Sequence, residues 1–339
     1  MMKKKILCLL FLMILLTSAN SFAEEKLIFA VDLVRHGDRT PTYQIPKSYI
    51  LWKEGLGELT AQGINHEIQL GEQLRKNYIN RYHLLPKIYD PNSIYVRSTN
   101  FNRTIKSADS LLLGLYPINV RPLLNQKIPI CAVPNAEDNL LVVKPNRNIF
   151  SLINRYVATH KDWKEKTINL QDQLKYWSKE TGLPLNNFQQ LDRLADNLYV
   201  RKLNHISLPK GISSRDADKI ILLSESEIIS EFKLKDVTHP MGREFLKTVS
   251  NYLEQAIQHK TSLKYVLLSG HDSSIMSVMN TLESPLEKIP GYASDLNFSL
   301  FESNKKYYVK VSFNNKPVNI PACGGSTCTI SQFNDVGQA

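Results

Sequence analysis

The sequence predicts an α/β protein in which helices cover a mostly parallel sheet. Three apolar, β-prone segments, at 27–34, 94–96 and 265–268, are each followed by polar residues and then by helical periodicity. Strands that alternate with helices form parallel sheets, and near-continuous apolar strands are typical of sheets buried on both faces. The 339 residues suffice for one large core with a sizeable insertion.

Residues 1–23 have the pattern of a cleavable export signal. Three lysines at 3–5 precede an apolar run from Ile6 to Leu16, and Ser21-Phe22-Ala23 is a small-x-small cleavage site. The apolar run is too short to cross a bilayer as a helix. We therefore expect an exported protein, periplasmic or secreted, whose mature chain has no membrane span.

The first predicted strand, at 27–34, ends in a dense group of polar side chains. Arg35, His36 and Arg39 place two guanidinium groups around one imidazole, and Gly37 provides a turn residue. Open α/β sheets bind ligands at the carboxyl ends of their strands. A basic turn that stands alone is more often simply solvated, so the rest of the chain decides its meaning.

The next elements repeat this arrangement. Residues 60–78 carry apolar side chains at helical spacing after Thr60, a residue type that caps helices. Ile94 to Val96 predicts a second strand, and Arg97 follows it directly, before another predicted helix. Although such an arginine is more often part of a surface salt bridge, a βαβ arrangement would place Arg97 beside the first strand end.

From 123 to 238 the pattern changes, and we expect a mainly helical cap inserted into an α/β core made of 24–122 and 239–339. Prolines interrupt the first part of this stretch, and no alternating strand pattern is visible in it. Apolar stripes at helical spacing then predict helices at 148–160, 163–181 and 187–204.

The last part of the chain completes the predicted sheet. Pro240 predicts the start of a helix, and the apolar run at 265–268 predicts a third buried strand that ends in His271 and Asp272. Alternating apolar residues at 296–300 and 307–313 predict an added hairpin. The tail beyond Cys328 is polar and is expected at the surface.

Cysteine usage fits an oxidising compartment. Cys323 and Cys328 could close a short disulfide loop, which would leave Cys131 unpaired. A short loop removes little entropy from the unfolded chain, so this bridge would hold the tail rather than the fold.

The three strand ends together predict a phosphate site. Guanidinium groups match phosphate oxygens, and nearby arginines would keep the imidazole of His36 neutral and nucleophilic. Asp272 would protonate the departing oxygen. The helix dipole favours an ionised Asp272 whereas a bound phosphate favours the protonated form, so we expect activity only at acidic pH.

These motifs resemble those of the histidine acid phosphatase family, in branch 2 of the histidine phosphatase superfamily. The resemblance rests on R-H-G-D-R-T-P at 35–41, L-T-x-x-G at 59–63, L-G-x-x-L-R at 70–75, V-R-S-T at 96–99 with Arg103 and Thr104 beyond it, and H-D at 271–272. It implies that His36 is transiently phosphorylated and that Asp272 donates the proton. It also implies that the phosphate is held by Arg35, Arg39, Arg97 and His271.

The resemblance also implies a three-layer αβα core like that of phosphoglycerate mutase, with a smaller helical cap. It implies a phosphomonoester substrate, no metal or other cofactor, and often a homodimer. Asp38-Arg39-Thr40 and Ser273-Ser274 are closer to acid phosphatases of the prostatic and lysosomal type than to phytases, but they do not exclude phytate.

Other functions have less support. The net charge of +10 is spread along the chain without a basic run, which argues against nucleic-acid binding. The remaining histidines show no trustworthy spacing with carboxylates for a metal site. A phosphosugar mutase and a periplasmic phospholigand receptor stay open as alternatives, although a receptor would need neither a nucleophilic His36 nor Asp272.

Overall fold

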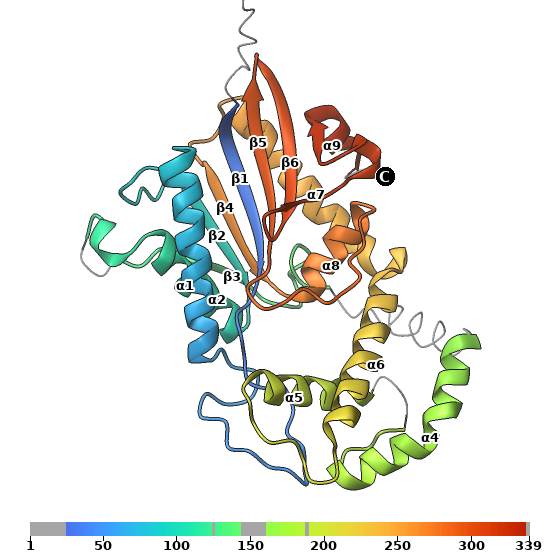
Figure 1. Ribbon diagram of the computed structural model, residues 1–339. Coiled ribbons are helices and arrows are strands. Elements are labelled where there is room, and N and C mark those ends of the chain that lie inside the picture. The colour runs from blue at the N-terminus through green and yellow to red at the C-terminus, as the bar shows by residue number, and fades with distance from the viewer. Residues whose placement is uncertain (1–24, 124–125, 144–160, 187–189, 337–339) are drawn as a thin grey trace, which may run out of the picture.

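The computed structural model describes residues 25–123, 126–143, 161–186 and 190–336 (Figure 1). The expected export signal at 1–23 lies outside the described residues. Strands in the described part form one sheet in the order β3-β2-β4-β1-β5-β6-β7, and β8 pairs with β6. The strands are β1 (Lys26–Arg35), β2 (Ile94–Thr99), β3 (Cys131–Val133), β4 (Tyr265–Gly270), β5 (Asp295–Ser303), β6 (Lys306–Phe313), β7 (Lys316–Pro317) and β8 (Thr327–Thr329).

The central part of the sheet is parallel. Strands β1 to β4 run in the same direction, whereas β5 is antiparallel to β1 and forms the predicted hairpin with β6. In this register Arg35 lies opposite Gly270, and Ser98 lies opposite Ser269. The residues that follow β1, β2 and β4 therefore begin at one edge of the sheet and at nearly the same level.

Helices cover both faces of the sheet. Figure 1 shows α1 and α2 on one side and α7, α8 and α9 on the other, so the predicted fold class, a three-layer αβα core, is confirmed. The helices of the described residues are α1 (Ala61–Arg75), α2 (Asn102–Leu115), α4 (Lys161–Thr181), α5 (Leu191–Leu203), α6 (Ser214–Phe232), α7 (Lys235–Ile257), α8 (Asp272–Thr281) and α9 (Ile330–Val336). Shorter helical turns are the π-helix η1 (Lys76–Arg81) and the 3-10 turns η2 (Ile118–Val120) and η4 (Pro321–Cys323).

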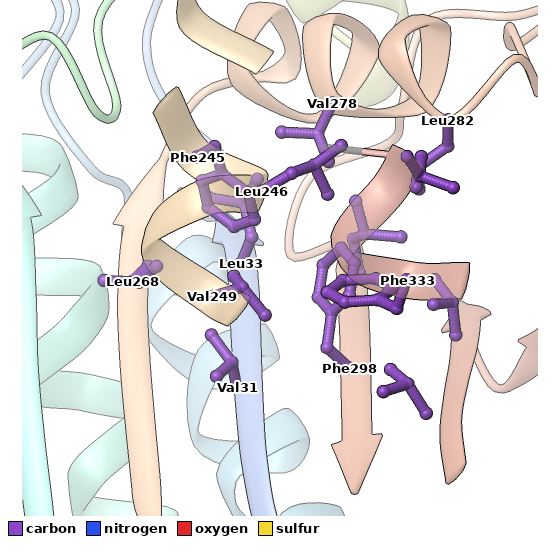
Figure 2. Close-up of a cluster of buried hydrophobic side chains, with 14 of the residues drawn as sticks. Val31, Leu33, Phe245, Leu246, Val249, Leu268, Val278, Leu282, Phe298 and Phe333 are labelled. Atoms are coloured by element: carbon purple, nitrogen blue, oxygen red, sulfur yellow. The ribbon is translucent and has the colours of Figure 1, made fainter. Parts of the chain in front are cut away.

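Side chains along β1 point alternately to the two faces of the sheet, and this explains why helices pack on both faces. Val31 and Leu33 pack with α7 and α8, and Figure 2 shows them beside Phe245 of α7. Ala30 and Val34 face the opposite way and pack with α1 and α2. Each large apolar side chain buried in this manner stabilises the fold by about 2 kcal/mol relative to exposure. Strand β1 is therefore held from both faces, which fixes the position of the residues at its carboxyl end.

The two helices on the first face approach each other closely. A Cβ atom on Gly71 of α1 would collide with the backbone carbonyl oxygen of Leu111 in α2. Glycine at this position therefore permits a backbone-to-backbone contact that any larger residue would prevent. This contact holds the last turns of α2 tightly against α1.

Helices α4, α5 and α6 have a hydrophobic core of their own. Trp177, Leu194 and Ile220, one from each helix, are fully buried together, and Ile45 from the loop after β1 joins them. Figure 1 shows α5 and α6 beyond the end of β1. The loop that follows β1 thus connects the sheet edge with this second core.

The start of the predicted cap needs a correction. Strand β3, at 131–133, lies inside the stretch that we assigned to the cap, and it extends the sheet by pairing with β2. Leu140 and Leu141 belong to the core on the α7 face. Three residues at a sheet edge are too few to produce an alternating pattern, which is why the sequence did not reveal this strand.

Other element boundaries also differ from the prediction. Helix α6 was not predicted, although Ser213 and Asp216 form a capping box at its start. Helix α7 begins at Lys235, so Pro240 lies inside it and does not start it. The helix predicted at 148–160 lies outside the described residues.

The tail beyond Cys328 is not a surface segment. Phe333 is fully buried and Val336 nearly so, and both pack into the core on the α7 face. Cys323 and Cys328 are joined by a disulfide, and Cys131 is free and exposed. The bridge therefore lies next to the segment that brings α9 onto the core.

Candidate active site

His36 follows β1 directly, and its side chain is almost fully buried. Its Nδ1 lies 2.9 Å from the backbone oxygen of Gly37. A carbonyl oxygen can only accept a hydrogen bond, so Nδ1 must carry the proton in this contact. The other ring nitrogen, Nε2, then holds a lone pair, which is what a nucleophile requires.

The turn after His36 depends on glycine. A Cβ atom on Gly37 would lie 2.5 Å from the backbone oxygen of Gly63 in α1, closer than atoms can approach. The amide of Gly37 donates a hydrogen bond of 3.0 Å to the Ser107 hydroxyl in α2. Both face helices therefore hold the backbone that orients the imidazole.

Arg35 is the last residue of β1, and three groups fix its guanidinium. Nη2 lies 2.6 Å from the Asp272 carboxylate, and Nη1 donates to the backbone oxygen of Pro290. The Tyr292 ring packs 4.4 Å from the guanidinium carbon. Tyr292 also lies against the His36 ring, with 5.7 Å between centroids. Tyr292 was not among the predicted site residues, because a tyrosine in a loop has no sequence pattern that marks it.

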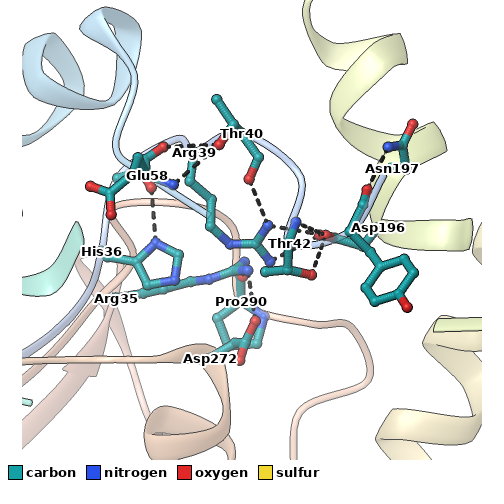
Figure 3. Close-up of polar contacts among 12 residues, drawn as sticks. Arg35, His36, Arg39, Thr40, Thr42, Glu58, Asp196, Asn197, Asp272 and Pro290 are labelled. Atoms are coloured by element: carbon teal, nitrogen blue, oxygen red, sulfur yellow. Dashed lines mark hydrogen bonds and ion pairs between the residues drawn. The ribbon is translucent and has the colours of Figure 1, made fainter. Parts of the chain in front are cut away.

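Arg39 is held from the opposite side by α5. Its two terminal nitrogens pair with the Asp196 carboxylate at 2.9 and 3.2 Å. Figure 3 shows the Asp196 carboxylate facing both Arg39 and Thr42, and the amide and hydroxyl of Thr42 donate to it at 2.8 and 2.9 Å. Asp196 therefore fixes the loop after β1 to α5 and orients Arg39 toward the pocket.

His271 and Asp272 join this group from the end of β4. The rings of His271 and His36 meet edge to face, with 5.5 Å between centroids. His271 Nε2 lies 3.1 Å from the Thr99 hydroxyl at the end of β2. Asp272 opens α8, and its side chain is 30% exposed and reachable from the pocket. The structure thus brings five predicted residues, Arg35, His36, Arg39, His271 and Asp272, to one place.

Arg97 does not join them, and this prediction is corrected. Strand β2 continues to Thr99, three residues past the predicted end, so Arg97 lies two residues back from the sheet edge, a distance of about 7 Å. Its guanidinium pairs with the fully buried Asp138 at 2.7 Å. Arg97 therefore neutralises a buried carboxylate and connects β2 with the segment after β3.

Arg103 takes the place that we predicted for Arg97. It is the second residue of α2, and its guanidinium packs over Phe101 at 4.5 Å. Phe101 in turn lies against the His271 ring, with 5.2 Å between centroids. Burial, together with the charge of Arg39, lowers the pKa of Arg103 to about 10, which still leaves it charged at physiological pH. The sequence signal was its position at a helix start directly after a strand end.

The positive charges set the protonation of both histidines. Burial and the charge of Arg35 lower the pKa of His36 well below its usual value, and Arg103 and Arg39 act in the same direction. Burial and Arg103 lower the pKa of His271 to about 3. Both imidazoles are therefore neutral even in moderately acidic solution.

The Asp272 carboxyl group tends to be ionised in the free site, whereas a proton donor must be protonated. Burial raises the pKa of Asp272, but the charge of Arg35 and the hydrogen bond from the amide of Ser273 lower it overall. Without a ligand, Asp272 is therefore ionised and paired with Arg35. An anion that competes for Arg35 would weaken this pair and raise the pKa of Asp272.

A pocket of about 380 Å³ lies next to these groups, between the sheet edge and helices α5 and α6. Arg35, Arg39, Asp272 and Tyr292 line its inner end, and residues of α5 and α6 line its outer end. Among the described residues, no group of three or more histidines, cysteines or carboxylates is placed to hold a metal ion. The arrangement is an anion clamp around a neutral imidazole.

Comparison with known proteins places this arrangement in a family. The family profile described as histidine phosphatase superfamily (branch 2) matches residues 26–210 and 232–314. Prostatic acid phosphatase from Homo sapiens is 27% identical over 334 residues, which cover 93% of this chain and 85% of that protein. Lysosomal acid phosphatase from Xenopus laevis is 28% identical over 353 residues, which cover 96% of this chain and 80% of that protein.

Solved structures agree on the fold. The apo form of Hafnia alvei phytase superposes with a TM-score of 0.66 at 17% identity, covering 93% of this chain and 96% of that one. Klebsiella sp. phytase gives a TM-score of 0.67 at 15% identity, covering 93% and 96%. At such identities these structures support the fold alone.

Proposed function

The chain belongs to branch 2 of the histidine phosphatase superfamily, and we propose that it is an acid phosphatase that hydrolyses phosphate monoesters through a phosphohistidine on His36. The observation that carries this proposal is the state of the His36 ring. Its Nδ1 is bound to the Gly37 carbonyl, which leaves the Nε2 lone pair free to attack. Burial, together with the charges of three arginines, lowers the pKa of His36 and keeps the ring neutral at acidic pH.

In the first step the substrate phosphate binds among Arg35, Arg39 and Arg103, near His271. Guanidinium groups bind phosphate oxygens with short, charge-assisted hydrogen bonds. Nε2 of His36 then forms a bond to phosphorus as the ester P–O bond breaks. The departing oxygen takes its electron pair from that bond and a proton from Asp272.

The proton on Asp272 depends on the substrate. Before binding, the charge of Arg35 holds the pKa of Asp272 down. A bound phosphate shares Arg35 and adds negative charge beside the carboxyl group, which favours its protonated form. In acidic solution the phosphate arrives with a proton of its own, so the complex holds the proton that the leaving group needs. Activity should therefore fall as the pH rises toward neutrality.

In the second step water attacks the phosphorus atom of the phosphohistidine. The P–N bond breaks and returns its electron pair to Nε2, while the Asp272 carboxylate takes a proton from the attacking water. Inorganic phosphate leaves with that proton, so that His36 returns to its neutral form and Asp272 to the carboxylate that pairs with Arg35. Asp272 thus acts as acid in one step and as base in the next.

Turnover of p-nitrophenyl phosphate at about pH 5 tests this proposal, because a group with an acid-range pKa acts best there. The full chain should release nitrophenol, and His36→Ala should abolish the release. His259→Ala, which removes an exposed histidine at the end of α7, is the matched control and should keep full activity. Tight phosphate binding without any turnover would instead favour the receptor function.

Two further features are part of the proposal. We propose that α4, α5 and α6 act as the cap over the pocket, since α5 and α6 supply its outer wall. We also propose export, on the evidence of the pattern at residues 1–23. Across the described ranges, none of the helices is both long and apolar enough to cross a membrane.

A further inference from the structure

The outer end of the active-site pocket differs in charge from its inner end. The inner end carries the arginines that face the phosphate. At the outer end, the charged residues among those described are the carboxylates of Asp192, Asp196 and Glu225 and a single cation, Arg193. Asp196 is paired with Arg39, and Arg193 packs on the Tyr43 ring at 4.4 Å. Burial raises the pKa of Asp192 to about 6, so this carboxyl group is largely uncharged in acidic solution, and Glu225 carries the negative charge that a leaving group meets.

Aromatic and aliphatic side chains form a wall that runs from the inner end of the pocket to its outer end. Tyr292 lies beside His36, and Tyr199 of α5 continues the wall, with 6.2 Å between the two ring centroids. Ile221 and Ile228 of α6 complete an apolar surface on the same side of the pocket. Tyrosine rings attract cations through their faces, so this wall suits an apolar body that bears a positive charge.

Glu225 is held at the pocket wall by the backbone. One of its carboxylate oxygens accepts a hydrogen bond of 3.2 Å from the amide of Ile289, in the loop that also supplies Pro290 and Tyr292. The loop that fixes Arg35 thus also fixes Glu225. The carboxylate has a defined position at the end of the pocket away from the phosphate clamp.

We propose that this pocket selects phosphate monoesters whose alcohol carries a positive charge, and that Glu225 is the residue that selects them. The proposal rests on the phosphatase activity proposed above and adds the class of leaving group. A leaving group with further phosphates would bring negative charge against Glu225. Inositol hexakisphosphate is therefore a poor substrate for this pocket.

A set of small monoesters that differ mainly in charge tests the proposal, and the comparison of parent with variant removes the differences in leaving-group acidity. The monoesters are 2-aminoethyl phosphate, ethyl phosphate and phosphoglycolate, with inositol hexakisphosphate as the polyanion. The expected order of kcat/KM is cationic, then neutral, then anionic. Each step should be roughly tenfold, which corresponds to unit charges about 6 Å apart at an effective dielectric constant of about 40.

Glu225→Gln keeps an oxygen for the Ile289 amide and removes the charge. The ratio of kcat/KM for 2-aminoethyl phosphate to that for phosphoglycolate should fall roughly tenfold or more. Tyr199→Leu, which removes an aromatic ring of the pocket wall, should lower the same ratio and provides the test if Glu225→Gln does not fold. Glu287→Gln makes the same charge change on an exposed residue that does not line the pocket, so it should leave the ratio unchanged.

The outcomes separate the two proposals. If p-nitrophenyl phosphate and ethyl phosphate are both inert, the proposed function itself fails. If ethyl phosphate is hydrolysed and the three monoesters give equal kcat/KM, the proposed selection is overturned while the phosphatase activity stands. A preference for the cationic ester that neither Glu225→Gln nor Tyr199→Leu reduces would show that this wall of the pocket does not select the leaving group.

Discussion

Glu227 of α6 should make the stability of this protein fall as the pH rises from acidic to neutral. Its side chain is 1% exposed, and neither carboxylate oxygen has a hydrogen-bond partner among the described residues. Burial, with Asp192 and Glu231 nearby, raises the pKa of Glu227 to about 8. The folded protein therefore keeps this carboxyl group protonated at a pH where the unfolded chain has released the proton.

The sign and size of this pH dependence of stability follow from proton linkage. A glutamate in an unfolded chain has a pKa of about 4.3, so between that pH and about 8 only the folded state holds the proton. In this window the free energy of unfolding falls by about 1.4 kcal/mol per pH unit for this group. From about pH 5 to about pH 7 the loss is about 3 kcal/mol, a large part of the stability of a typical domain.

Glu227→Gln tests this value because glutamine has nearly the same shape and cannot ionise. Urea unfolding should be followed at both pH values by tryptophan fluorescence, since Trp177 is fully buried in the core formed by α4, α5 and α6. The variant should lose about 3 kcal/mol less than the parent between the two pH values. Glu244→Gln, which removes an exposed carboxyl group on α7, should lose as much as the parent. Equal losses for parent and Glu227→Gln would refute the reasoning.

The other predictions concern the catalytic group. Arg103→Ala should lower kcat/KM for a phosphate monoester by roughly 100-fold, since it removes a charged hydrogen-bond donor from the phosphate site. Arg97→Ala should instead lower the urea midpoint, because it leaves the buried Asp138 unpaired; a larger loss of kcat/KM for Arg97→Ala than for Arg103→Ala would reverse our assignment. Asp272→Asn should slow alkyl phosphates by roughly 10²- to 10⁴-fold and p-nitrophenyl phosphate much less, and equal losses would show that Asp272 is not the acid. Gly37→Ala should remove activity, because its Cβ meets the Gly63 carbonyl; full activity of that variant would contradict the described turn.

Much of the fold and site could be predicted because strands and polar groups follow each other directly in the chain. The apolar runs at 27–34 and 265–268 became β1 and β4, and the residues immediately after them meet at the sheet edge. A parallel sheet guarantees this meeting, whatever the sequence separation. His36 and Asp272 could be paired for that reason alone.

The errors arose where a boundary or a long-range contact decided the outcome. Arg97 was assigned to the site because β2 was expected to end at Val96, and three further strand residues changed which side chains reach the edge. Asp196 orients Arg39 from α5, more than 150 positions away in the chain. No periodicity in the sequence indicates a contact of this kind, which forms only when the cap and the sheet pack together.

The phosphorylated enzyme itself provides the most direct test. The full chain should be mixed with a labelled phosphate monoester, quenched within one turnover and digested, and the labelled peptide should be sequenced. We predict a phosphoryl group that is lost in acid and kept in alkali, as phosphoramidates behave, and that maps to His36. Label on any other residue, or none in a protein that turns the ester over, would contradict attack by the His36 imidazole.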